Sequence, residues 1–151
     1  MKPKILYYIF IGIAVFLLLV YINYLNAQVA LKETRPSQLS VELISYPESV
    51  TIGGKGSFFW HVQSSPDLST SFSTIYWGYQ SSPSALTKMD SPQAVGYPYS
   101  QPDYTNGRYR LPSDFELGIR FDKPGLVFFR AYAKVGSGHL WSEERSLEVV
   151  K

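Results

Sequence analysis

The side chains that could carry out acid–base, metal or nucleophilic chemistry are few and widely separated in this sequence. His61 and His139 are the two histidines, and no HxH or HExxH spacing joins them in a metal-binding motif. The twelve acidic residues are dispersed, with no DxDxDG calcium loop, and no serine lies in a GxSxG motif. Gly-rich nucleotide-binding loops are absent as well. We therefore expect surface histidines, a protein that is not an enzyme, and no metal or cofactor.

Cysteine content and charge exclude further classes of function. The sequence has no cysteine, which excludes disulfides, iron–sulfur clusters and thiol catalysis. Fourteen Lys/Arg and twelve Asp/Glu give a formal net charge of +2, and Lys2 and Lys4 account for this excess. The rest of the chain is therefore neutral. A nucleic-acid-binding module needs a basic surface, so nucleic acid is not an expected partner.

The residues best suited to binding are four tyrosines in a proline-rich segment. They are Tyr97, Tyr99, Tyr104 and Tyr109. Tyrosine offers a large, stiff contact area with a polar tip, which suits recognition of sugars or proteins. Aromatic side chains held between prolines also commonly pack on their own domain. Two interpretations stay open: a binding loop that carries these four residues, or an aromatic cap over one end of the domain.

The elements that must position these tyrosines are β-strands. Beyond residue 38 apolar side chains recur every second residue, which predicts strands rather than helices. Trp60 shares one side of its strand with Phe58 and Val62, so we expect it in the core, together with Trp77. The two longest alternating runs place one set of side chains inward: Phe115, Leu117, Ile119 and Phe121 in the first, and Val127, Phe129, Ala131, Ala133 and Val135 in the second. The intervening residues, including Arg130 and Tyr132, should lie on the other face.

Turn-forming residues separate the predicted strands. They occur at Gly53-Gly54, Asn106-Gly107, Pro124-Gly125 and residues 136–138. Residues 81–106 contain four prolines and are expected to form a long loop or ragged edge, with a brief strand at Ala94-Val95. Six or seven short strands with regular turns predict a β-sandwich.

Several segments carry a resemblance to a known family. They are GSFFWHV at 56–62, TIYWGY at 74–79, PGLVFFRAYA at 124–133 and GSGHLWS at 136–142. These segments resemble strands and turns of fibronectin type III and related immunoglobulin-like domains, over about residues 39–150. The resemblance implies an all-β antiparallel sandwich that serves as a scaffold for binding and spacing. The family usually has a tyrosine where this chain has Phe128.

An unbroken apolar run covers residues 5–25, close to the N-terminus. A transmembrane helix needs about 20 such residues, so the run predicts a signal anchor. Lys2 and Lys4 precede it and predict a cytoplasmic N-terminus. Cleavage as a signal peptide after Leu25-Asn26-Ala27 is the alternative. A pilin-like helix is another, although the sequence lacks the Gly leader and early Glu of that family.

Together these patterns predict four regions. Residues 1–4 are cytoplasmic, 5–25 span the membrane, 26–38 form a stalk, and 39–151 form an extracytoplasmic β-sandwich. The predicted function is a non-enzymatic binding or assembly module at the cell surface. Its expected partners are the lipid bilayer and another envelope or surface protein or carbohydrate. The alternatives are a pilin-like filament subunit and a single-span accessory subunit of a membrane protein complex.

Overall fold

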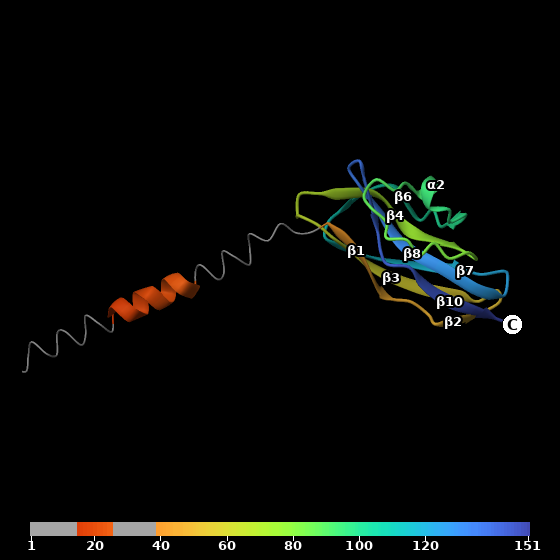
Figure 1. Cartoon of the computed structure of the whole chain (residues 1–151), viewed down its shortest axis with the longest axis horizontal. Coiled ribbons are helices and arrows are strands. Elements are labelled where there is room, and N and C mark those ends of the chain that lie inside the picture. Colours follow the sequence, from red (N-terminus) through yellow and green to blue (C-terminus); the bar gives the residue numbers. More distant parts are fainter. Residues whose placement is uncertain (1–14, 26–38) are drawn as a thin grey trace, which may run out of the picture. The chain divides into compact units, whose positions relative to one another are not determined.

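The computed structural model describes residues 15–25 and 39–151 (Figure 1). The chain divides into two units, Met1–Pro36 and Ser37–Lys151. Residues 15–25 are helical. Across the described ranges, no helix is both long enough and apolar enough to cross a membrane. Lys2 and Lys4, the first part of the predicted span at 5–14 and the predicted stalk at 26–38 lie outside the described residues.

The C-terminal unit is built on two β-sheets. The first sheet has the order β1-β3-β7 and is antiparallel throughout. Its strands are β1 (Ser40–Ser45), β3 (Lys55–Gln63) and β7 (Ser113–Arg120).

The second sheet has β8 and β4 at its centre. Its order is β2-β10-β8-β4-β5, with β6 also paired to β4 and β9 paired to β8. The strands are β2 (Ser49–Thr51), β4 (Ser69–Gly78), β5 (Tyr99–Ser100), β6 (Tyr104–Arg110), β8 (Gly125–Val135), β9 (Gly138–Trp141) and β10 (Arg145–Val150). The short strand β2 runs parallel to β10, whereas the other pairs are antiparallel.

The core lies between the two sheets and follows the predicted alternation. Phe58, Trp60 and Val62 on β3 are fully buried, and so are the predicted inward residues of β8 from Val127 to Ala133. Trp60 is thus confirmed in the core, while Trp77 is half-buried and packs against it. The first edge strand is split, because β1 pairs with the first sheet and β2 with the second. The prediction of an all-β, immunoglobulin-like sandwich is confirmed.

Two local predictions were wrong. Asn106 and Gly107 lie inside β6, where the pairing with β4 shifts register and Asn106 has a positive φ of 67°. Asparagine tolerates that conformation, so the predicted turn is instead a bulge within the strand. Ala94 and Val95 belong to the one-turn helix α2 (Pro92–Val95) rather than to a strand.

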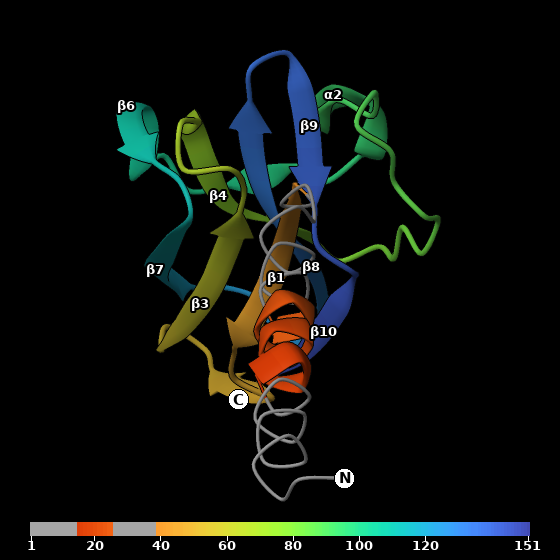
Figure 2. The same cartoon turned by 90° about the vertical axis from the view of Figure 1, so that its left-hand side faces the viewer.

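The outer face of the second sheet is covered by residues 79–103, which we call the covering segment. Figure 2 shows α2 lying beside β9, and the Lys88 carbonyl accepts a hydrogen bond from the His139 N–H at 3.0 Å. The Trp141 indole donates to the Asp90 carbonyl at 2.8 Å. Arg130 and Tyr132 lie on the outward face of β8, as predicted, but the covering segment packs over this face and leaves them only 4% and 2% exposed.

Candidate functional site

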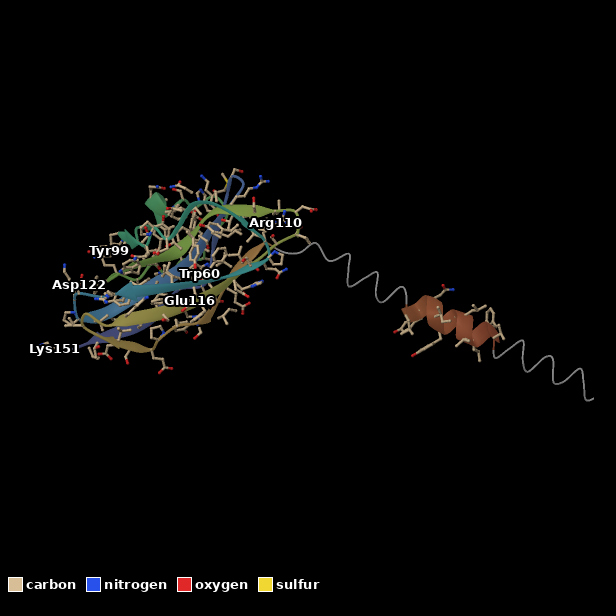
Figure 3. The ribbon with its side chains drawn as sticks, turned by 180° about the vertical axis from the view of Figure 1, so that it is seen from behind. Trp60, Tyr99, Arg110, Glu116, Asp122 and Lys151 are labelled. Carbon is tan, nitrogen blue, oxygen red and sulfur yellow. The ribbon has the colours of Figure 1, made fainter. Side chains whose placement is uncertain are left out.

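An aromatic cleft lies at one end of the sandwich, and we call it the distal cleft. It has a volume of about 170 Å³ and is lined by Trp77, Tyr79, Tyr99, Arg120, Phe121, Asp122 and Lys123. Figure 3 shows Tyr99 and Asp122 at one end of the domain and Arg110 at the other. Arg120 pairs with Lys55 at the cleft end of β3, whereas Ser40 pairs with Gln63 at the opposite end. The chain therefore enters the sandwich at the end remote from this cleft.

Strand pairing places the aromatic rings of the distal cleft. Trp77 is near the end of β4 and pairs directly with Tyr99 on the two-residue strand β5. Their rings stack with centroids 5.8 Å apart and an interplanar angle of 28°. Phe121 meets the edge of Trp77 at 6.1 Å, and Tyr79 meets Tyr99 at 6.5 Å. Such contacts each add roughly 0.5–1.5 kcal/mol, so the rings are held in place before any ligand arrives.

Polar groups lie at the rim of the distal cleft. The Tyr79 hydroxyl donates a hydrogen bond to the Lys123 carbonyl at 3.2 Å. Burial raises the pKa of Tyr79, and the nearby Tyr99 and Asp122 raise it further, so this hydroxyl stays protonated. Arg120, Lys123 and Asp122 are exposed and offer donors and acceptors beside the rings. An aromatic platform with both kinds of polar group fits a ligand that has an apolar face and hydroxyl groups at its edge.

The four predicted tyrosines are distributed over three places. Tyr99 lines the distal cleft and is 42% exposed. Tyr104 and Tyr109 come together, with ring centroids 5.5 Å apart, and both pack on the core residue Phe115. Tyr97 is 6% exposed and lies apart from them beneath the covering segment. The structure therefore does not gather the four residues into one loop surface, and their role in binding stays a prediction.

Tyr97 and Arg130 are buried and belong to a polar group that we call the Arg130 cluster, which also includes the half-buried Glu144 and Ser82 and the exposed Ser81. Arg130 donates from Nη1 to the Ser142 carbonyl at 2.9 Å and from Nη2 to the Ser82 carbonyl at 2.7 Å. Its Nε donates to the Tyr97 hydroxyl at 3.3 Å. The cluster thus joins β8 to the covering segment at two places, Ser82 near its start and Tyr97 near its end.

Glu144 completes the cluster from the other side. Its carboxylate accepts hydrogen bonds from the Ser81 hydroxyl at 2.5 Å, from the Ser82 N–H at 2.6 Å and from the Tyr97 hydroxyl. Burial opposes ionisation of Glu144, but these three hydrogen bonds and the charge of Arg130 outweigh it and lower the pKa. Sequence reasoning missed this cluster. The available signal was an arginine between aromatic and small apolar residues in the middle of a strand.

The two histidines lie on different sheets. His61 is on the outer face of β3, where Nδ1 is 2.6 Å from Asp114 Oδ1 and Nε2 is 3.0 Å from Gln63 Oε1. The hydrogen bond with Asp114 raises the pKa of His61. His139 is on β9, and its Nδ1 is 2.7 Å from the Tyr132 hydroxyl. Among the described residues, no three His, Asp or Glu side chains are grouped as a metal site.

The strand order and the buried inter-sheet core define an immunoglobulin-like β-sandwich. No protein-family model matches this chain, and no curated protein matches it either. Among solved structures, it is similar to the PKD domain of an M14-like peptidase from a Thermoplasmatales archaeon, with 16% identity and a TM-score of 0.48. It is also similar to a CARDB domain from Pyrococcus furiosus, with 10% identity and a TM-score of 0.40. Each similarity covers 74% of this chain and 94% of the other domain.

Proposed function

We propose that this protein is a non-enzymatic binding module of the cell surface, which holds one ring of a surface carbohydrate in its distal cleft. The stacked pair of Trp77 and Tyr99 carries this proposal. The C–H face of a pyranose ring packs well on an aromatic ring, and its hydroxyls can reach Asp122 and Arg120 at the rim. The apolar face of the sugar would thus pack on the aromatic rings, and its hydroxyls would form hydrogen bonds at the rim.

The size of the distal cleft supports a polymer rather than a free small molecule as the ligand. Sites that enclose small ligands usually have volumes of roughly 300–1,000 Å³. The distal cleft has about 170 Å³ and lies at the end of the domain, so it would hold part of a longer chain. We infer that most of that chain stays in solvent.

Membrane anchoring is part of the proposal. Residues 15–25 are helical and contain no charged side chain, as expected for part of a membrane-spanning helix. Lys2 and Lys4 favour a cytoplasmic N-terminus and therefore an extracytoplasmic sandwich. Within the sandwich, the chain begins at the end opposite the distal cleft, because Ser40 pairs with Gln63 and Arg120 with Lys55.

Replacing Tyr99 with alanine should weaken carbohydrate binding about 30-fold, as expected for an aromatic side chain at the centre of a binding site. The measurement is a titration of the full chain, in mild detergent, with neutral surface polysaccharides. Phe59→Ala is the matched control, because Phe59 is 39% exposed against 42% for Tyr99 and lies on the other sheet. Equal affinities for Tyr99→Ala and Phe59→Ala, or no binding by the wild type, would contradict the proposal.

A further inference from the structure

A second cleft lies on the outer face of the second sheet, and we call it the outer cleft. It has a volume of about 340 Å³, within the range of sites for small ligands, and it is separate from the distal cleft. Three aromatic rings form its floor. Tyr132 is at their centre, with centroids 5.7 Å from Phe72 and 5.4 Å from Tyr76. These rings belong to adjacent strands β4 and β8, so the sheet fixes their positions.

Strand register places Lys134 and His139 beside these aromatic rings. Lys134 on β8 pairs with Phe72 on β4 and with His139 on β9, so the three side chains are neighbours across the sheet. Lys134 is exposed and His139 is half-buried. Burial raises the pKa of Tyr132, so its hydroxyl keeps its proton, and this hydroxyl lies 2.7 Å from His139 Nδ1.

The covering segment and the bulge of β6 supply the remaining walls. Pro92 and Gln93 from α2 line one side, and Asn106 from the bulge lines another. The side-chain amides of Gln93 and Asn106 can form hydrogen bonds with hydroxyl groups of a ligand. Among the described residues that line the outer cleft, none is acidic. Asp90 lies close enough to influence His139, but its carboxylate accepts hydrogen bonds from Thr87 at 2.6 and 2.7 Å, which lower its pKa and hold it in its own turn.

We propose that the outer cleft is a second binding site and takes a sugar ring that carries a carboxylate. The ring would pack on Phe72 and Tyr76, and the carboxylate would pair with Lys134. Charge complementarity selects this occupant, because the lining carries one formal positive charge and no negative one. The amides of Gln93 and Asn106 would bond ring hydroxyls, which a purely hydrophobic ligand lacks. This proposal stands independently of the distal cleft.

The test is a calorimetric titration of the full chain, in mild detergent, with trigalacturonate and with triglucuronate. The methyl ester of each acid is the neutral comparison. We expect an acid to bind at least tenfold more tightly than its ester, because a hydrogen bond to a charged group contributes roughly 1.5–3 kcal/mol. Lys134→Gln should remove this preference. Lys55→Gln is the control, since Lys55 is exposed on the first sheet, and it should retain the preference.

Each other outcome contradicts the proposal. Failure of both acids to bind would overturn it, and so would equal affinity for acid and ester. An acid preference that Lys134→Gln leaves unchanged would place the carboxylate elsewhere. Binding of tetraglutamate in place of the sugars, with the same dependence on Lys134, would assign an acidic peptide and overturn the saccharide class. Tyr99→Ala should leave the preference for acid over ester intact, because Tyr99 lines only the distal cleft. A negative result for carbohydrate binding at the distal cleft can therefore be told apart from a negative result at the outer cleft.

Discussion

Replacing Arg130 with leucine should lower the free energy of unfolding by about 3–5 kcal/mol, the usual cost of removing one partner from a buried polar network. Leucine fills part of the space but donates no hydrogen bond. The carbonyls of Ser82 and Ser142 would then lose their donor, and Glu144 would lose its nearby positive charge. Urea unfolding of the full chain in mild detergent, followed by near-ultraviolet circular dichroism, measures this loss.

Arg145→Leu is the matched control for that experiment. Arg145 is exposed and pairs with the exposed Glu143 at 2.8 Å, so its loss should cost less than about 1 kcal/mol. Hydrogen exchange gives a second measurement, because Arg130→Leu should raise exchange in residues 81–98 more than in β3. Equal stability of Arg130→Leu and the wild type would show that the Arg130 cluster does not hold the covering segment.

Replacing Trp60 with alanine should also lower the free energy of unfolding by about 3–5 kcal/mol. Trp60 is fully buried and stacks on Phe115 at 5.6 Å. Its indole donates a hydrogen bond to the Ser73 hydroxyl at 2.8 Å, which links β3 of the first sheet to β4 of the second. The substitution therefore leaves both a cavity and a buried hydroxyl without its donor. Thermal unfolding of the full chain in mild detergent provides the measurement.

Phe59→Ala gives the comparison, because Phe59 immediately precedes Trp60 on β3 and faces away from the core with 39% exposure. Its replacement should cost less than about 1 kcal/mol, as is usual for surface positions. Similar losses for Trp60→Ala and Phe59→Ala would mean that β3 does not have the register described here.

Local alternation was sufficient to predict much of the sandwich. Phe115, Leu117 and Ile119 are separated by polar residues or glycine, and a period of two places them on one face wherever the strand pairs. All three are buried in the core. The same reasoning placed Arg130 and Tyr132 on the outward face of β8, but it did not predict that they are buried. Their burial comes from the covering segment, which is distant in the sequence. Alternation along a strand contains no information about a segment that packs over it.

The candidate site could be predicted only in part, for a similar reason. The tyrosines at 97, 99, 104 and 109 are close in sequence, but strand register and side-chain direction separate them. Pairing with Trp77 brings Tyr99 to the distal cleft, whereas Tyr97 turns toward Glu144. Phe121 and Asp122 join Tyr99 from the loop that follows β7. Asn106-Gly107 has the composition of a hairpin turn, and it is the pairing of β4 with β6 that makes it a bulge.

The three tryptophans allow one direct test of the central claim, that the distal cleft is the carbohydrate site. Trp60 is in the core, Trp77 is in the distal cleft, and Trp141 donates to Asp90 beside the outer cleft. Their indole N–H signals can be followed by NMR in the full chain, labelled with ¹⁵N-tryptophan, while a neutral surface oligosaccharide is added. Our account predicts a saturable shift of the Trp77 signal with little change at Trp60 and Trp141. A saturable shift of Trp141 alone, or binding that moves none of the three signals, would contradict it.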